Sequence, residues 1–422
     1  MAMNDRRAGG DPRWRSTEGL RQPHQHQGWW GDSTSRDSRP APVRSSGTPV
    51  QPVWDRPPRR RTAFNAILVI VAALVVAAVL LLLSVSLGPS AFLLCGILAF
   101  VPLGICLLGI GWIDRWDPEP RGALLFAFLW GAGASVVVSL LLGTYVVELL
   151  GTAFSTTSPE VIGPVLQAPL VEEFAKGLGV LILVYTRRSH FDGPVDGIVY
   201  AGTVAAGFAF TENILYFGAA VLETGTAGAL VGVFILRGLF SPFAHVMFTA
   251  FLGFVLGSAL NRGGNRRILG AFILGLLPAI AGHMLWNGGT LVLFHDFFLF
   301  YFVVQVPLFI VAVIAVVFLR RSERRLTEAR LGDYAGAGWF TAEEVRMLAT
   351  RPGRSQALAW AQSVGARQDM REFIRTGTRI AHTRQRMLGG RLDAHDVAEE
   401  RALLEEATQR RARIIRLAST VR

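Results

Sequence analysis

The feature that most constrains this chain is a series of apolar runs, each long enough to cross a membrane. A helix needs about 20 residues to span the hydrocarbon core of a bilayer. Eight such runs occur in the sequence, at 64–87, 90–112, 122–150, 164–186, 196–222, 229–260, 268–293 and 297–319. They predict an all-α fold, a polytopic membrane bundle of about eight transmembrane helices. The sixth run is too long for one span and contains Arg237, Ser241 and Pro242, so we expect a broken or partly re-entrant helix there.

The segments on either side of this block have a different composition. Residues 1–62 are rich in Gly, Pro, Ser, Gln and Arg without apolar periodicity, which predicts a disordered cytosolic tail. Because polar residues fill this segment, the first apolar run does not resemble a cleavable signal peptide. Residues 320–422 show apolar residues three to four apart among Arg and Glu, which predicts a cytosolic helical region. The transmembrane domain is therefore expected to cover 63–319.

The charge distribution supports a membrane protein and argues against a nucleic-acid partner. The net charge is +11, but it divides into +6 for residues 1–62, −3 for 63–319 and +8 for 320–422. The arginines near the spans fall in alternate connections, at 59–61, 115–121, 187–188, 262–267 and 320–321. Positively charged loops stay on the cytoplasmic side. We therefore expect a multi-pass protein of the cell membrane, in contact with the lipid bilayer, with both termini cytoplasmic.

Several polar residues lie inside the predicted spans, where they are costly and usually functional or paired. These residues are Glu172, Glu173, Lys176, Glu212, Asn213, Arg237, His245, His283 and Asn287. With the orientation above, Glu172, Glu212 and His283 lie about 8 to 10 residues from the outer ends of their helices. His245 lies deeper unless the sixth span is broken. Two glutamate-bearing and two histidine-bearing helices can thus converge on one polar chamber.

Each of these residues also has a simpler interpretation. The glutamates and Lys176 have the spacing of ion pairs that neutralise charge within one helix. His245 can be a core histidine hydrogen-bonded between helices, and His283 with Asn287 can join neighbouring helices. Arg237 can pair with Glu223 or Glu148. The combination is more informative than its members, because two histidines with several glutamates resemble a metal or water-activating hydrolytic site.

The order of these residues resembles the PrsW family of intramembrane proteases. The matching segments are Glu172-Glu173-Phe-Ala-Lys176, Phe208-Ala-Phe-Thr-Glu212-Asn213, His245 and His283-Met-Leu-Trp-Asn287. The loop that starts at Asp114 also resembles a landmark of that family. The resemblance covers roughly 100–290 and leaves out both tails.

The resemblance implies a membrane-embedded hydrolase, an intramembrane endopeptidase that is either a metalloprotease or a metal-free glutamate enzyme. Glu172 or Glu173 would be the general base, and Lys176 would neutralise the pair. His245 and His283, with Glu212, would hold a zinc ion or orient the water. Asn287 would be an oxyanion donor, with Asn213 beside Glu212 in the catalytic set. The implied partner is a membrane-anchored protein substrate, an anti-sigma factor that undergoes site-one cleavage.

Two other function classes fit the same residues. A proton-coupled transporter would use the glutamates and histidines as a relay, although no internal repeat accompanies the spans. A non-catalytic membrane scaffold would use the helices of 320–422 to recruit a partner.

Overall fold

The computed structural model describes residues 59–154, 159–187, 191, 193–260, 266–294, 296–389 and 394–420. Within these ranges the regular elements are all helices and no strand occurs, which confirms the predicted all-α class. The predicted tail, 1–62, lies outside the described residues up to residue 58, and the last four of its residues begin the first helix. The described chain forms two compact units: the first contains the residues up to Glu323 and the short stretch that begins at Arg386, and the second contains Arg324–Gln385 and the C-terminal helix.

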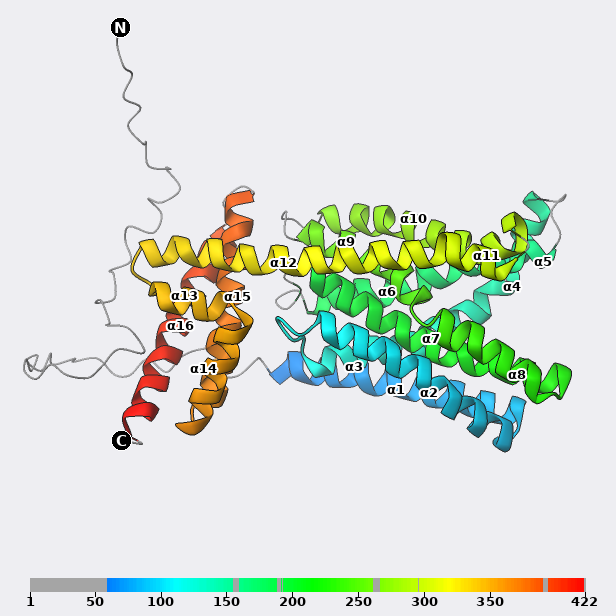
Figure 1. The fold of residues 1–422 in the computed structure, drawn as a ribbon, viewed down its shortest axis with the longest axis horizontal. Coiled ribbons are helices and arrows are strands. Elements are labelled where there is room, and N and C mark those ends of the chain that lie inside the picture. Colours follow the sequence, from blue (N-terminus) through cyan, green and yellow to red (C-terminus); the bar gives the residue numbers. More distant parts are fainter. Residues whose placement is uncertain are drawn as a thin grey trace, which may run out of the picture. The chain divides into compact units, whose positions relative to one another are not determined.

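The first unit is built from long helices and short π-helical turns (Figure 1). Its elements are α1 (Arg59–Leu87), α2 (Pro89–Ile113), α3 (Arg121–Leu129), η2 (Trp130–Ser135), α4 (Val136–Ala153), α5 (Pro159–Val161), η3 (Ile162–Gln167), α6 (Ala168–Thr186), α7 (Pro194–Thr224), α8 (Ala227–Val233), η5 (Phe234–Phe240), α9 (Ala244–Leu260), α10 (Arg266–Gly288), η6 (Gly289–Phe294), α11 (Phe297–Phe300), η7 (Tyr301–Gln305) and the first part of α12 (Val306–Gly336).

Seven segments of the described chain are long and apolar enough to cross a membrane. They correspond to seven of the eight predicted spans, and the multi-pass character is therefore confirmed. The remaining predicted span, 164–186, forms η3 and α6. It differs from the others because Glu172, Glu173 and Lys176 lie within the 19 residues of α6. All three side chains are buried, since α6 packs against α4, α7, α9 and α10. The polar helix is therefore enclosed by the apolar ones.

The sixth predicted span is broken, as its sequence indicates. After α8 and η5 the helix stops at Phe240, and α9 starts at Ala244. Pro242 has no backbone N–H, and it disfavours helical backbone at the residue before it. Ser241 accordingly has a non-helical φ of −122° and ψ of 29°. The break ends two residues before His245 and determines where α9 begins.

Helix α7 lies at the centre of this unit and most of its residues are buried. It contacts α2, α3, α9 and η2. A Cβ atom on Gly197 would lie 2.0 Å from the carbonyl oxygen of Gly253 on α9, so only glycine permits this approach. The small residues of α7 and α9 therefore pack helices closely, which brings Glu212 and His245 onto adjoining surfaces.

The outer surface of the first unit is apolar. Large aliphatic side chains are strongly exposed on α2 and α12, as at Leu108 (78%) and Ile314 (61%). Water would disfavour such a surface, whereas lipid tails solvate it well.

The second unit consists of the end of α12 with α13 (Ala342–Ala349), α14 (Arg351–Ser363), α15 (Arg367–Gly389) as far as Gln385, and α16 (Ala394–Thr420). Its apolar core includes Leu348, Phe373 and Leu404. Arg411 donates two hydrogen bonds to Glu344, at 2.7 and 3.0 Å, and so ties α16 to the start of α13. The predicted helices of the C-terminal region are therefore present.

Candidate active site

The Glu-Glu-Lys segment of α6 forms a buried ion pair. Residues three and four apart on a helix lie on one face, and Lys176 follows the two glutamates at these spacings. The Lys176 Nζ lies 2.6 Å from Glu173 Oε1 and 3.8 Å from Glu172 Oε2. Neither the Lys176 nor the Glu173 side chain is exposed. The lysine therefore neutralises mainly the second glutamate.

Both carboxylate oxygens of Glu173 contact neighbouring polar side chains. Thr249 Oγ1 of α9 donates to Glu173 Oε2 at 2.8 Å. His283 Nδ1 of α10 lies 3.1 Å from Glu173 Oε1, the oxygen that also contacts Lys176. A carboxylate that binds one imidazole nitrogen fixes the ring and directs the other nitrogen elsewhere. Glu173 therefore holds His283 in a defined orientation.

Glu172 presents the free carboxylate oxygen of the site. His283 Nε2 faces Glu172 Oε2 at 4.0 Å, which is beyond hydrogen-bonding distance. Within the described part of the chain, this buried oxygen has no hydrogen-bond partner. A buried polar atom without a partner is costly and commonly marks a position for a water or an ion. Glu172 Oε2 thus faces both His283 Nε2 and the Lys176 ammonium without a hydrogen bond to either.

His245 joins this cluster from the first turn of α9. Its Nδ1 lies 3.2 Å from Lys176 Nζ, and its Nε2 lies 2.7 Å from Glu212 Oε2. An ammonium group can only donate, so Nδ1 accepts and Nε2 donates its proton to Glu212. The rings of His245 and His283 are 5.1 Å apart and nearly perpendicular. The break before α9 therefore places His245 between the lysine and Glu212.

Arg237 of η5 pairs with Glu212, with its Nη2 2.6 Å from Glu212 Oε2. The alternative expectation of a pair with Glu223 or Glu148 is wrong. The π-helical turn η5 leads back along α7, so the arginine reaches the carboxylate that already contacts His245. Arg237 also lies over the ring of Tyr216, 3.7 Å from its centre.

Aromatic side chains surround the polar cluster. Lys176 Nζ lies 4.4 Å from the centre of the Phe208 ring, and Phe208 meets the edge of His245 at 5.5 Å. Phe248 stacks on His283 at 5.1 Å. This apolar surrounding strengthens the electrostatic interactions among the charged groups.

The two predicted asparagines lie outside the cluster. Asn213 is buried on α7, but consecutive helical residues do not share a face. Among the described residues, no hydrogen bond joins it to the glutamates or histidines of the cluster. Asn287 donates to the carbonyl oxygen of Pro164 at 2.8 Å and so links α10 to η3.

Three of the predicted residues have the geometry of a metal site. The ligand atoms of Glu172, His245 and His283 all lie within 4.8 Å of one another. Ligands of a tetrahedral zinc ion are about 3.3 Å apart, given bond lengths of about 2.0–2.2 Å. The ligand atoms, which lie 4.8 Å apart or less, would have to move closer together around an ion, and Glu172 Oε2 has no hydrogen bond to give up. The residues therefore fit a divalent metal; Glu172 belongs to this group of three, and Glu212, the carboxylate that the sequence predicts as a ligand, lies 2.7 Å from His245 Nε2.

Sequence reasoning missed two contributors. Thr249 anchors Glu173, and Phe208 covers Lys176. A signal for both was present, because Thr249 follows His245 by four residues and Phe208 precedes Glu212 by four. Such spacing places each of them on the same helix face as a predicted site residue.

The loop between α2 and α3 is held by a second polar group. Asp114 Oδ1 accepts from the backbone N–H of Glu119 at 3.0 Å, and Tyr200 of α7 donates to Glu119. Burial raises the pKa of Asp114 to about 7. This loop anchors the end of α7 and contributes no group to the cluster above.

The comparisons with protein families and with individual known proteins indicate the same family. Residues 119–312 match the family described as "PrsW family intramembrane metalloprotease". The chain is 35% identical over 170 residues to Protease PrsW of Geobacillus kaustophilus (40% of this chain, 68% of the relative). It is 32% identical over 188 residues to Protease PrsW of Clostridioides difficile (44% and 74%) and 31% identical over 169 residues to that of Bacillus subtilis (39% and 69%). No solved structure gives a match. The chain belongs to the PrsW family of intramembrane proteases.

Proposed function

We propose that this membrane protease is an endopeptidase that cuts a membrane-anchored protein at a centre formed by Glu172, His245 and His283. One observation carries the proposal. Three residues from three helices place their ligand atoms within 4.8 Å, and the Glu172 oxygen in that set is buried without a hydrogen-bond partner. The proposal requires these residues to act together on one water molecule.

We propose that zinc is the ion, held by Glu172, His245 and His283. Two imidazoles and one carboxylate are a common ligand set of catalytic zinc, which keeps one position open for water. When bound, such an ion lowers the pKa of its water and polarises the substrate carbonyl. His245 would give up the proton that it shares with Glu212, as histidines do on binding a metal.

The remaining residues of the cluster orient these groups. Glu173 holds His283 through Nδ1, and Lys176 keeps the Glu173 carboxylate ionised within an apolar surrounding. Glu212 is the carboxylate that borders His245 without belonging to the three-residue set, so we propose that this carboxylate takes the proton from the attacking water. Arg237 restrains Glu212 in that position. A role for Asn287 as an oxyanion donor stays a prediction, and it requires the amide to leave the Pro164 carbonyl.

The proposed setting is the cell membrane, with both termini in the cytoplasm and the site in the outer half of the bilayer. The arginine-rich connections support this orientation. The domain organisation proposed from the sequence, with soluble tails at 1–62 and 320–422, fits the same arrangement. We propose a membrane-spanning anti-sigma factor as substrate, on the basis of the family resemblance.

The test is cleavage of a single-span protein by the purified full-length chain in lipid vesicles. Glu172→Gln, His245→Ala and His283→Ala are expected to abolish cleavage, and Glu212→Gln is expected to slow it by about 10²–10⁴-fold. Cys95→Ser serves as the control, because Cys95 is buried in α2 among apolar residues. Unchanged cleavage in Glu172→Gln would refute the proposed centre.

A further inference from the structure

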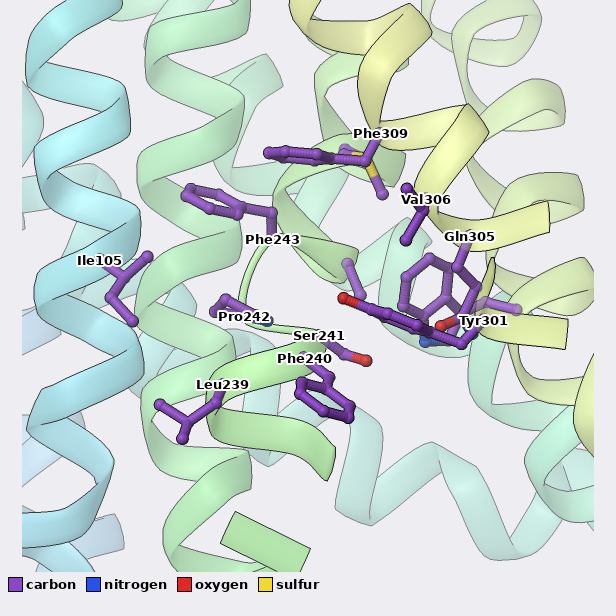
Figure 2. A pocket seen from close by; sticks show the side chains of 13 residues that line it. Ile105, Leu239, Phe240, Ser241, Pro242, Phe243, Tyr301, Gln305, Val306 and Phe309 are labelled. Atoms are coloured by element: carbon purple, nitrogen blue, oxygen red, sulfur yellow. The ribbon is translucent and has the colours of Figure 1, made fainter. Parts of the chain in front are cut away.

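A second feature of the first unit is an apolar cavity of about 190 Å³, separate from the polar cluster (Figure 2). Its walls come from α2, from the break between η5 and α9, from the end of α10, and from η7 with the start of α12. Two stacked aromatic pairs form much of the wall. Phe243 stacks on Phe309 at 5.3 Å, and Phe240 stacks on Tyr301 at 5.1 Å. Stacked aromatic rings therefore line much of the cavity.

The cavity adjoins the candidate active site. Ala244 lines it and directly precedes His245. Neighbouring Cα atoms are about 3.8 Å apart, so the wall begins within one residue of the site. On the other side, Trp286 lines the cavity and meets the edge of Phe248 at 5.6 Å, and Phe248 stacks on His283. His245 is therefore adjacent in the chain to a residue of the wall, and His283 is connected to the wall through Phe248, which contacts Trp286.

The helix break shapes the cavity. Non-helical backbone is tolerated at membrane depth where it is buried in protein or lines a cavity. Cys106 of α2 donates to the carbonyl oxygen of Pro242 at 2.9 Å and so satisfies one group that the break releases. The break thus opens space beside His245 while its backbone stays anchored to α2.

One polar atom in the cavity wall remains unsatisfied. Gln305 is only 2% exposed, and its Oε1 has no hydrogen-bond partner in the described part of the chain. An amide carbonyl in an apolar wall requires a donor. A lipid acyl chain has none, whereas a peptide segment that leaves the helical conformation presents free backbone N–H groups. Gln305 therefore favours an unwound peptide over a lipid as the occupant.

We propose that this cavity is a substrate subsite, which receives one large apolar side chain next to the bond that is cut. Gln305 Oε1 accepts a backbone N–H of the same unwound segment. An apolar cavity of about 150 Å³ is large enough to hold benzene, so a cavity of about 190 Å³ admits the side chain of leucine, methionine or phenylalanine. The inference rests on the proposed function and specifies which substrates it accepts.

A cross-linking experiment tests occupancy without requiring cleavage. A photoreactive amino acid replaces Val306, which lines the cavity, in full-length protein that also carries Glu172→Gln. The matched control replaces Ile314, which lies on the same helix and is 61% exposed on the apolar surface. In vesicles that contain a single-span substrate with an apolar segment, we expect peptide adducts from position 306 and none from 314. Lipid adducts alone at position 306, or no peptide adduct there, would overturn the subsite.

A size-exchange experiment tests the specificity that the cavity imposes. Substrates that differ only in the residue beside the cut are compared, with Gly, Leu, Phe and Trp. Wild type is expected to prefer Leu or Phe over Gly and Trp by about tenfold, consistent with the modest discrimination of apolar pockets. Phe309→Ala enlarges the cavity and should shift the preference toward Trp, whereas Phe302→Ala on the exposed surface should not.

Gln305→Leu should raise KM by about fivefold with little change in kcat, as expected for the loss of one hydrogen bond that is made before the reaction. The subsite is refuted if Phe309→Ala leaves the order of substrates unchanged. If wild type cuts no substrate while position 306 still yields peptide adducts, the proposed function fails and the binding site stands.

Discussion

Removing the lysine of the Glu-Glu-Lys segment should destabilise the protein through a charge that loses its partner. In Lys176→Met the side chain keeps most of its length and loses the ammonium group. Glu173, which is fully buried, then retains only the Thr249 hydroxyl and His283 as partners. The carboxylate remains in an apolar surrounding without a counter-ion.

The structure gives the size of this effect. Removing one member of a buried ion pair costs about 3–5 kcal/mol, and the two remaining hydrogen bonds favour the lower end. For a domain of 150–250 residues, close to the size of the first unit, a change of 1 kcal/mol shifts the melting temperature by roughly 2–4 °C. Lys176→Met should therefore lower the apparent melting temperature by about 10 °C, followed by tryptophan fluorescence in detergent.

A double variant separates the charge from the shape. Lys176→Met combined with Glu173→Gln removes both charges, and the amide oxygen can still accept from His283. Replacing both members of a buried pair is often neutral, so this variant should melt within a few degrees of wild type. The reasoning is refuted if the single variant melts like wild type, or if the double variant melts as low as the single one.

Three further predictions concern other parts of the molecule. Arg237→Ala should lower cleavage by at least about tenfold, because Glu212 loses a charged hydrogen bond, while the melting temperature should fall less than in Lys176→Met, because the Arg237 side chain is 30% exposed. Burial raises the pKa of Asp114 from 3.8 to about 7, so the folded state holds a proton that the unfolded state releases. Stability should then fall as pH rises from about 4 to 7, and Asp114→Asn should remove that slope in melting experiments. Reporter fusions within 151–163 and 223–228 should lie outside the cell and those within 187–190 and 262–267 inside, and a cytoplasmic signal from residue 155 would overturn the orientation.

The sequence predicts the membrane helices well because length and hydropathy are local properties. The spans at 64–87 and 90–112 correspond closely to α1 and α2, and Pro242 indicates the break in the sixth span. The predicted span at 164–186 is helical, but its charged residues set it apart from a simple lipid-facing helix. The local sequence pattern therefore predicted this helix, but not that neighbouring helices bury its charged residues.

The contacts of the site depend on packing that no local pattern contains. The spacing of Glu173 and Lys176 predicts their ion pair, since both lie on one helix face. In contrast, the partner of Arg237 depends on how η5 folds back along α7. The sequence alone did not distinguish between Glu223 and Glu148 as the predicted partner. The same holds for Glu172 as the carboxylate nearest both histidines, because this depends on how α6, α9 and α10 cross. The aromatic cavity joins residues up to about 200 positions apart and was not predicted.

The most direct measurement of the central claim is the metal content of purified full-length protein and its variants, determined by elemental analysis beside cleavage activity. Wild type should contain about one zinc ion per chain, and Glu172→Gln, His245→Ala and His283→Ala should each lose both metal and activity. Glu212→Gln should keep the metal and lose most of the activity, because this carboxylate is proposed to move a proton and not to hold the ion. Full activity in metal-free wild type, or loss of the metal in Glu212→Gln with retention in Glu172→Gln, would contradict the account.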